Sequence, residues 1–396
     1  MRVALFVETY LPYINGVVTH VKLLKEGLES LGHEVLVITA DPGTYRHRLQ
    51  GNVLHCPAKK FKKLYGYGLA SPISKKRMRI LKNFDPDVLH IHQEFGVGLF
   101  GAMAAKMLKK PLVYTLHTMY DDYLYYIAPR KLIPAAKRVS HDYSRFLAKR
   151  ATALTGPSAK VQEYFEQCGL HKHVNVVRNP VETETFCREK ITQEQTRAVR
   201  KQYDIPEDAT LLCFCGRIGK EKSVDVLLQF WKEAVTEQDN AYLMILGDGP
   251  CREELCELAA SLGISDHVRF TGKVLHEELP PYYAASDLYI TASLSDTNSI
   301  SMLEGMSTGL PVLHILDELN AGQVKHGVNG FIYESAEQMA QEIRDWKALP
   351  DEEKKALSER TRQSVLCAGA TDLAKTIEGI YQSAIDSNLR ELAEKA

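Results

Sequence analysis

Short apolar segments of strand length alternate with helical segments along this chain, and the series occurs twice. The first series opens with an apolar strand at Val3–Val7, followed by a helical pattern with apolar residues at positions 17, 21, 24, 28 and 31 that ends at Gly32. Buried strands that alternate with helices form a parallel sheet covered on both faces. The strands predicted in the first half are Val3–Val7, Glu34–Thr39, Asp87–His92, Pro111–Leu116, Ala151–Thr155 and His173–Val177.

A polar, charged segment at 182–208 interrupts the alternation, and a second series follows it. We interpret the segment near 180–205 as a linker and Asn179-Pro180 as a hinge. The C-terminal 335–396 has the pattern of amphipathic helices. The strands predicted in the second half are Thr210–Cys215, Ala241–Gly247, His267–Thr271, Asp287–Ala292, Pro311–Ile315 and Gly330–Tyr333.

A chain of 396 residues is too long for one ordinary domain. The predicted fold class is α/β, with two doubly wound, Rossmann-like domains that face each other across a cleft. We expect an N-terminal domain at 1–180 and a second domain at 181–372. A helical tail at 373–396 is expected to pack back on the first domain. Ligands of such sheets bind beyond the carboxyl ends of the strands.

Composition excludes several classes of protein. The formal net charge is −1, so nothing global indicates a nucleic-acid partner. The eight cysteines are scattered without paired zinc spacing, which is typical of reduced thiols in a cytosolic protein. The apolar start is too short for a signal peptide, and no stretch approaches the roughly 20 apolar residues that a membrane span needs.

The run from Ser295 to Pro311 contains two carboxylates, Asp296 and Glu304, eight positions apart. We expect Asp296 on a loop and Glu304 about two turns into a helix that stops at Gly309. A polar loop that leads into a helix N-terminus offers backbone N–H groups to an anion. This layout suits a phosphate flanked by hydroxylated rings, as in a nucleotide sugar.

A basic turn follows the first strand of the second half. Gly216 lets the backbone approach a ligand, and Arg217 and Lys222 are placed to neutralise a diphosphate. The alternative is a solvated basic loop.

The next two strands end in glycine-containing turns. Gly247, Asp248 and Gly249 follow one strand, where the glycines leave space for a flat base or simply form a turn. The segment 270–274, which ends at Val274, follows the next strand and is a candidate for binding a nucleobase edge, with the same ambiguity.

Histidines mark two strand ends in the first half. His117 ends a buried strand and begins a polar, aromatic loop. His90 and His92 alternate on one strand, which hints at a metal, but no third ligand is evident in the sequence. We therefore expect packing or a cleft lining there, and no metal site.

Taken in order, these motifs resemble the retaining GT-B glycosyltransferases of family 4, over nearly the whole chain. The family's Glu-x7-Glu motif is represented by Asp296 and Glu304. The resemblance implies that Glu304 holds the donor ribose and that His117 contacts the donor hexose. It also implies that the N–H of Gly16 meets the donor phosphate, with a simple Asn15-Gly16 turn as the alternative. The hexose contacts implied by the resemblance are Asp296, Thr297, Asn298, Ser299 and Ile300.

The mechanism implied by the resemblance is direct transfer with retention of the anomeric configuration. Arg217, Lys222 and the helix N-terminus would stabilise the leaving nucleoside diphosphate, with His117 and Asp296 completing the catalytic set. We expect no cofactor other than the UDP-sugar co-substrate and no divalent metal, because Arg217, Lys222 and a helix end would supply the charge that a metal otherwise provides.

A basic stretch in the first half indicates a membrane surface. Positions 59–82 contain nine Lys or Arg residues and no acid, interleaved with aromatic and aliphatic residues. The alternative is a solvated helix face and a loop. The residues expected to bind an anionic membrane are Lys59, Lys60, Lys62, Lys63, Lys75, Lys76, Arg77 and Arg79.

Local strings such as 10–18, 115–123 and 294–298 resemble the bacterial branch of the family that glucosylates diacylglycerol from UDP-glucose. The resemblance implies a cytoplasmic enzyme peripherally bound to the inner membrane face, with a lipid acceptor. Alternatives are a soluble or polysaccharide-precursor acceptor, a nucleotide-sugar epimerase, and an inactive binding module. A dehydrogenase is disfavoured because Glu8-Thr9-Tyr10 stands where a glycine motif would follow the first strand.

Overall fold

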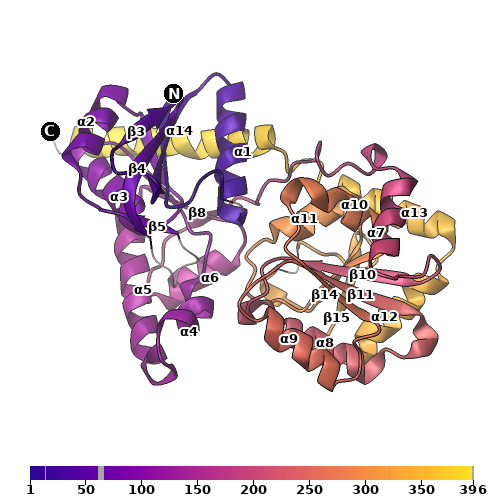
Figure 1. Cartoon of the computed structure of the whole chain (residues 1–396). Helices are drawn as coiled ribbons and strands as arrows, with labels where there is room; N and C mark the ends of the chain where they lie inside the picture. The colour runs from indigo at the N-terminus through magenta and orange to yellow at the C-terminus, as the bar shows by residue number, and fades with distance from the viewer. Residues whose placement is uncertain (14, 61–66, 321, 395–396) are drawn as a thin grey trace. The chain divides into compact units, whose positions relative to one another are not determined.

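The computed structural model describes residues 1–13, 15–60, 67–320 and 322–394 (Figure 1). The chain forms two compact units. The first comprises Met1–Pro180 together with Gly369–Ala396, and the second comprises Val181–Ala368. The chain therefore returns to the first unit at Gly369, four residues before the tail expected from the sequence (373 − 369).

The sheet of the first unit has β1 at its centre, with β2 and β6 as parallel neighbours. The strand order is β3-β4-β2-β1-β6-β7-β8-β9, and β5 pairs with β4. The predicted strands are confirmed, whereas β3, β4 and β5 were not predicted. The strands are β1 (Arg2–Val7), β2 (Glu34–Asp41), β3 (Arg48–Gln50), β4 (Val53–Lys60), β5 (Gly68–Ala70), β6 (Val88–Ile91), β7 (Leu112–Thr115), β8 (Ala153–Gly156) and β9 (Val174–Val176).

Helices cover both faces of this sheet, as expected for buried parallel strands. They are α1 (Gly16–Ser30), α2 (Lys75–Phe84), α3 (Gly96–Leu108), α4 (Leu124–Ile127), α5 (Ile133–Arg150), α6 (Lys160–Gln167) and the C-terminal α14 (Ala370–Glu394). Helix α14 crosses α1, and Leu24 packs in one apolar cluster with Ile377 and Tyr381 (Figure 1). A Cβ at Gly27 would lie 2.1 Å from the Ala370 carbonyl oxygen, so the close approach of the two helices needs glycine there.

The second unit contains a parallel sheet in the order β12-β11-β10-β13-β14-β15. All six strands predicted from the sequence are present, with small shifts at their ends. They are β10 (Thr210–Cys215), β11 (Ala241–Leu246), β12 (Val268–Gly272), β13 (Leu288–Thr291), β14 (Val312–Ile315) and β15 (Gly330–Tyr333). The helices are α7 (Gln193–Gln202), α8 (Val224–Ala234), α9 (Arg252–Ser261), α10 (Leu279–Ala285), α11 (Ile300–Ser307), α12 (Ala336–Ala348) and α13 (Asp351–Gln363).

The segment interpreted as a linker is largely ordered structure, which corrects the sequence interpretation. Helix α7 lies within it and begins with a capping box formed by Thr192 and Gln195. Val199 of this helix is buried, and the Arg200 guanidinium donates to Asp287 at 2.9 Å. Most of the helix surface is polar, so its composition is similar to that of a linker although one face is anchored.

Both sheets have the strand order of a doubly wound fold, which confirms the predicted class. The order reverses between β1 and β6 in the first unit and between β10 and β13 in the second. Among the described helices, none combines the length and apolar character required to cross a bilayer. The loops that follow β10 and β13, at the reversal point of the second sheet, contain Gly216, Arg217, Lys222 and Asp296.

Candidate active site

The reversal point of the second sheet is bridged by an ion pair between Lys222 and Asp296. Lys222 ends a short 3-10 helix after β10, and Asp296 lies on the loop after β13. The Lys222 ammonium donates to Oδ1 of Asp296 at 2.5 Å. Burial opposes ionisation of Asp296, but Lys222 lowers the pKa of this carboxyl below its usual value. The two residues are 74 positions apart in the sequence, and they form an ion pair at the place where proteins of this fold bind their ligands.

Arg217 is held by its neighbour on the same turn. Its guanidinium forms an ion pair with Glu221, whose side chain is fully buried. The loop begins at Gly216, with φ of +158°. The backbone N–H of Gly216 donates to the Leu246 carbonyl at 3.0 Å. The predicted pair of cations is thus ordered by two acids, one of which, Glu221, was not singled out from the sequence.

Glu304 lies in a buried polar pocket formed by α10 and the turn before it. The His276 imidazole Nε2 lies 2.9 Å from Oε1 of Glu304, and the Tyr283 hydroxyl donates to Oε2 at 3.1 Å. Burial raises the pKa of Glu304 above its usual value. Helix α11 begins at Ile300, so Glu304 is only just over one turn into the helix, which corrects the two turns expected. His276 and Tyr283 were missed, because nothing in their local sequence marks them.

The loop between the two carboxylates is fixed by side chains that follow β14. Asn320 donates to the Asp296 carbonyl at 2.7 Å, and Gln323 donates to the Thr297 carbonyl at 2.9 Å. Ser299 caps α11 by accepting from the Met302 N–H. Thr297 and Asn298 are buried, and Ile300 is the first residue of the helix. The structure therefore places all five predicted hexose contacts on a braced loop and helix start.

The glycines after β11 lie close to the backbone of the loop that follows β10. A Cβ at Gly247 would lie 2.0 Å from the Gly216 carbonyl oxygen, and a Cβ at Gly249 would lie 2.3 Å from the Ile218 carbonyl oxygen. These glycines leave room for the chain's own backbone, and so hold two strand-end loops together. Asp248 is exposed and its carboxylate accepts from the Gly249 N–H, as in a turn. Val274 is half-buried beside the apolar core.

In the first unit, Gly16 is the first residue of α1. Asn15 caps this helix by accepting from the Val18 N–H at 3.0 Å, so Asn15-Gly16 begins a helix and is not an isolated turn. The Asn15 amide also donates to the Thr9 hydroxyl, and Thr9 donates its N–H to Gln93 at 3.0 Å. A helix N-terminus therefore lies at the reversal point of this sheet too.

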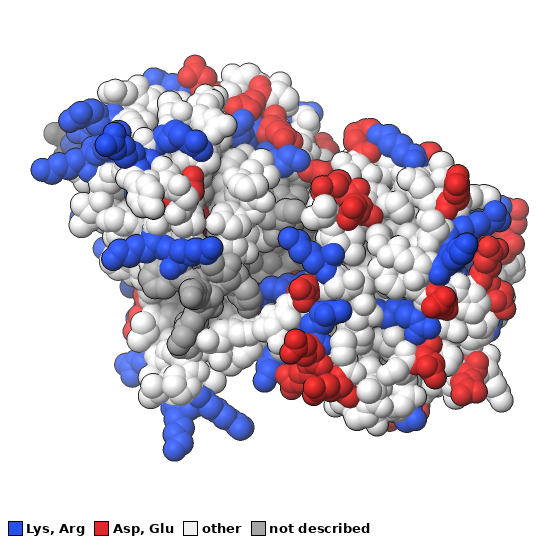
Figure 2. All heavy atoms as spheres, viewed as in Figure 1, with Lys and Arg blue, Asp and Glu red and all other residues white. Residues whose placement is uncertain are grey.

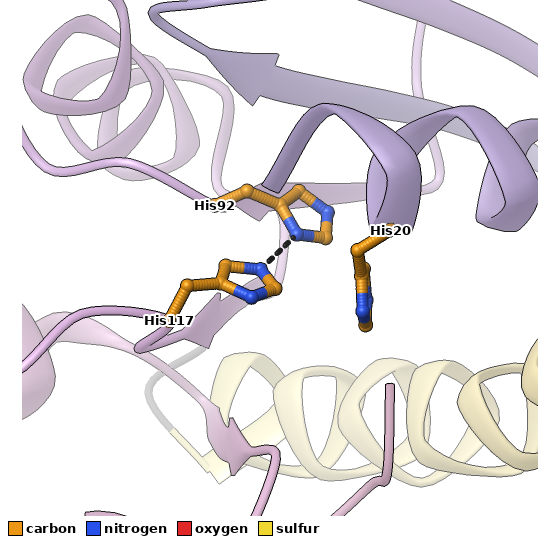
Figure 3. A group of neighbouring side chains, drawn as sticks. All are labelled: His20, His92 and His117. Carbon is orange, nitrogen blue, oxygen red and sulfur yellow. Dashed lines mark hydrogen bonds between the residues drawn. The ribbon is translucent and has the colours of Figure 1, made fainter. Parts of the chain in front are cut away.

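His117 belongs to a cluster of three histidines from different elements (Figure 3). His92 follows β6 and His117 follows β7, and their rings are joined by a 3.0 Å contact between Nδ1 of His92 and Nε2 of His117. The His20 ring, from α1, lies edge-on with its centroid 4.6 Å from that of His117. Burial lowers the pKa of all three, so the rings are neutral at pH 7. No local pattern in the sequence indicated that His20 joins this group.

A second buried network surrounds Glu94, on the loop after β6. Its carboxylate accepts hydrogen bonds from the hydroxyls of Tyr114 and Tyr120. The Tyr143 hydroxyl donates to the Glu94 carbonyl. Burial raises the pKa of Glu94 to about 7. The aromatic loop after His117 is thus anchored to the sheet by a carboxyl that can carry its proton near neutral pH.

The basic segment of the first unit is divided between surface and core. Figure 2 shows Lys and Arg side chains gathered over the end of the first unit that carries α2. Arg77 is an exception to the prediction: it is 1% exposed, donates to the Ser71 carbonyl at 3.0 Å and stacks over Phe100. Lys62 and Lys63 lie outside the described residues. The exposed basic residues of this segment, hereafter the α2 surface, are Lys59, Lys60, Lys75, Lys76, Arg79 and Lys82.

Helix α5 carries another basic surface, which was not predicted from the sequence. Leu132, Val139 and Phe146 are 56%, 69% and 40% exposed, and their spacing of seven residues places them along one side of the helix. The seven-residue spacing of these apolar residues could have indicated this surface from the sequence. The basic residues on and just before the helix are Arg130, Lys131, Lys137, Arg138, Arg145, Lys149 and Arg150.

Two doubly wound domains, one with cations and acids at its reversal point, define the GT-B class of glycosyltransferases. Comparison with known families agrees with this class. The family model described as glycosyltransferase family 4 matches residues 14–185, and the one described as glycosyl transferases group 1 matches residues 195–364.

Full-length relatives identify the family more narrowly. An alpha-monoglucosyldiacylglycerol synthase from Acholeplasma laidlawii is 30% identical over 100% of both chains. The enzyme of the same name from Streptococcus pneumoniae is 30% identical over 98% of this chain and 87% of its own length. Among solved structures, Anabaena Alr3699/HepE in complex with UDP has a TM-score of 0.73 over 97% of this chain and 100% of that chain, at 17% identity, which supports the fold. The chain belongs to glycosyltransferase family 4, as its motifs indicated.

Proposed function

We propose that the protein transfers a hexose, glucose, from UDP-glucose to a lipid acceptor such as 1,2-diacylglycerol, with retention of the anomeric configuration. The single observation that carries the donor half of this proposal is the Lys222–Asp296 pair at the reversal point of the second sheet. It joins a cation suited to a diphosphate to a carboxylate suited to sugar hydroxyls, in the position where ligands of this fold bind.

The leaving diphosphate is stabilised by charge and backbone dipoles. An ammonium has three N–H donors, and the contact with Asp296 uses one of them. Arg217 adds a guanidinium from the same loop, and the capped N-terminus of α11 adds backbone N–H groups. Removal of one such donor typically costs about 10²–10³ in rate. Two cations and a helix end supply the charge that a divalent metal would otherwise contribute, so the transfer proceeds without one.

The remaining contacts with the nucleotide sugar follow from the positions of the two carboxylates. Glu304 has one donor on each oxygen, from His276 and Tyr283, which fixes its plane for the ribose hydroxyls. Asp296 and the braced amides after it receive the hexose. In the first unit, the N-terminus of α1 at Gly16 meets the phosphate, and neutral His117 contacts the hexose. The leaving phosphate accepts the acceptor's proton on the same face, so no protein nucleophile is required.

The lipid acceptor is supported by the two relatives named alpha-monoglucosyldiacylglycerol synthase, which align over almost the whole chain. The two basic surfaces of the first unit support a bilayer as the place of reaction. Each Lys or Arg near an anionic leaflet contributes about 1 kcal/mol. The apolar side chains Leu132, Val139 and Phe146 add area that can enter the interface. The protein then acts as a peripheral enzyme on the cytoplasmic face of the membrane.

The test is a transfer assay with purified protein, UDP-glucose and diacylglycerol in vesicles, with the product's anomeric configuration read by NMR. We expect an α-linked glucosyl lipid, and transfer that persists in EDTA. A β-linked product would refute retention. Transfer only to soluble acceptors would refute the lipid acceptor, and release of an epimerised free sugar would favour the epimerase.

The membrane surface is tested separately by co-sedimentation with vesicles. Charge reversal at Lys75, Lys76 and Arg79 is expected to weaken binding to anionic vesicles and to leave binding to neutral vesicles unchanged, because these side chains are exposed. Lys201→Glu, at an exposed position of the second unit, is the control. Binding that is insensitive to salt and to anionic lipid would contradict the proposed surface.

A further inference from the structure

From the histidine cluster we infer that His20, His92 and His117 form a binding site for a divalent transition-metal ion of the zinc type. This inference goes beyond the proposed transfer reaction, which needs no metal. The three residues come from α1, the end of β6 and the end of β7, so the cluster exists only in the folded first unit (Figure 3).

The geometry is close to that of a three-histidine site. One ring nitrogen from each residue lies within 4.8 Å of the other two. Nitrogens bound to zinc at about 2.0–2.1 Å in tetrahedral geometry are about 3.3 Å apart. No two of these nitrogens therefore have to approach each other by more than about 1.5 Å, the difference between 4.8 Å and the separation in a zinc site. Three histidines would supply three of the four ligands of a tetrahedral ion.

The hydrogen bonds around the cluster leave suitable nitrogens for a metal. Nδ1 of His20 lies 2.9 Å from Oδ1 of Asn179, and this oxygen can only accept, so His20 carries its proton on Nδ1. Nε2 of His20 is then a bare lone pair, and it is buried with no hydrogen-bond partner among the described residues. A metal-bound histidine usually donates its other N–H to an oxygen in this way.

In His92, too, Nε2 is buried and lacks a hydrogen-bond partner among the described residues. The neighbouring His90 provides a contrast within the protein. Its ring lies tilted against that of His92, with centroids 3.9 Å apart, but both of its nitrogens are engaged, by the hydroxyls of Tyr381 and Thr115 at 2.7 Å each. Buried polar atoms normally have partners, so two such nitrogens in one cluster indicate a ligand.

The donor set decides which ion fits. Three neutral imidazoles with no carboxylate among them suit Zn²⁺, Co²⁺ or Ni²⁺, whereas Mg²⁺ and Ca²⁺ prefer oxygen ligands. A bound ion would also occupy a nitrogen of His117 and fix its ring. Because His117 is proposed to contact the hexose, Zn²⁺ would then inhibit transfer. This consequence rests on the proposed function, but the binding site itself does not.

The binding test is calorimetric titration of the full chain, freed of metal with a chelator, with Zn²⁺ and separately with Mg²⁺. We expect one Zn²⁺ per chain at micromolar affinity or tighter, and no uptake of Mg²⁺. His20→Gln and His92→Gln should each weaken binding at least tenfold, and Asn179→Ala should weaken it about 10- to 100-fold. His171→Gln, at an exposed histidine outside the cluster, should bind as the wild type does.

Circular dichroism establishes that each variant is folded, and the visible absorption of bound Co²⁺ provides a second readout in the wild type. Zn²⁺ affinity that is unchanged in both His20→Gln and His92→Gln would overturn the site, as would the absence of binding to the wild type. Transfer measured at saturating Zn²⁺ separates the two proposals. Binding without inhibition would retain the metal site and refute the role of His117 in the donor pocket.

Discussion

Replacement of Lys222 by Met tests the ion pair on which the donor site depends. The substitution keeps the aliphatic length of the side chain and removes its charge. The Lys222 and Asp296 side chains are only 16% and 22% exposed, so the carboxylate would lose its partner in a poorly solvated place. Breaking a fully buried pair costs about 3–5 kcal/mol, and partial exposure reduces the expected loss of unfolding free energy to about 2–3 kcal/mol.

The same substitution should affect catalysis independently of stability. Loss of one group that stabilises the leaving diphosphate is expected to lower kcat by about 10²–10³. The double variant Lys222→Met with Asp296→Asn removes the unpaired charge, and should recover stability without recovering transfer. Lys220→Met, at an exposed position of the same 3-10 helix, is the matched control and should change neither property.

The stabilisation by the Lys222–Asp296 pair should depend on pH, in a direction set by the pKa of Asp296. The pKa of Asp296 is lowered in the folded state, so the pair stabilises the fold at neutral pH, and this contribution decreases as the pH falls through the folded-state pKa. The stability difference between wild type and Lys222→Met, from thermal unfolding at several pH values, should therefore shrink in acid. Full transfer activity in Lys222→Met, or a stability difference independent of pH, would refute the reasoning.

Three further predictions concern other residues. His276→Ala removes one hydrogen-bond donor from Glu304 and should raise the KM for the nucleotide sugar about tenfold with little change in kcat. The reason is that a hydrogen bond to a charged group contributes about 1.5 kcal/mol. An unchanged KM in steady-state kinetics would contradict the proposal that His276 orients Glu304 for the nucleotide sugar. Gly247→Ala places a Cβ against the Gly216 carbonyl at a φ of +132° and should lower the thermal midpoint by several degrees, whereas a neutral outcome would mean that the two loops separate freely. Burial raises the pKa of Glu94 from 4.5 to about 7, so folding becomes less favourable as the pH rises through this range. Glu94→Gln should therefore make the free energy of unfolding fall less steeply between these pH values. An identical slope in the wild type and the variant would show that Glu94 is ionised there.

The sequence alone determined the fold and the chemical character of the donor site. Apolar strands alternating with helices require a covered parallel sheet, and the strand ends of such a sheet collect the loops on one edge. Asp296, Glu304, Arg217 and Lys222 could be found because their motifs are local and chemically distinctive. The position of α11 was predicted to within one turn from Gly309 and the polar run before it.

Only the tertiary structure decided which distant residues complete each site. Arg77 and Arg79 look alike in a basic segment, but the rotation of α2 buries one against Phe100 and exposes the other. His20 joins His92 and His117 because α1 passes over the ends of β6 and β7. Such partners depend on helix rotation and on sheet register, which arise from packing over the whole domain and leave no mark in the local sequence.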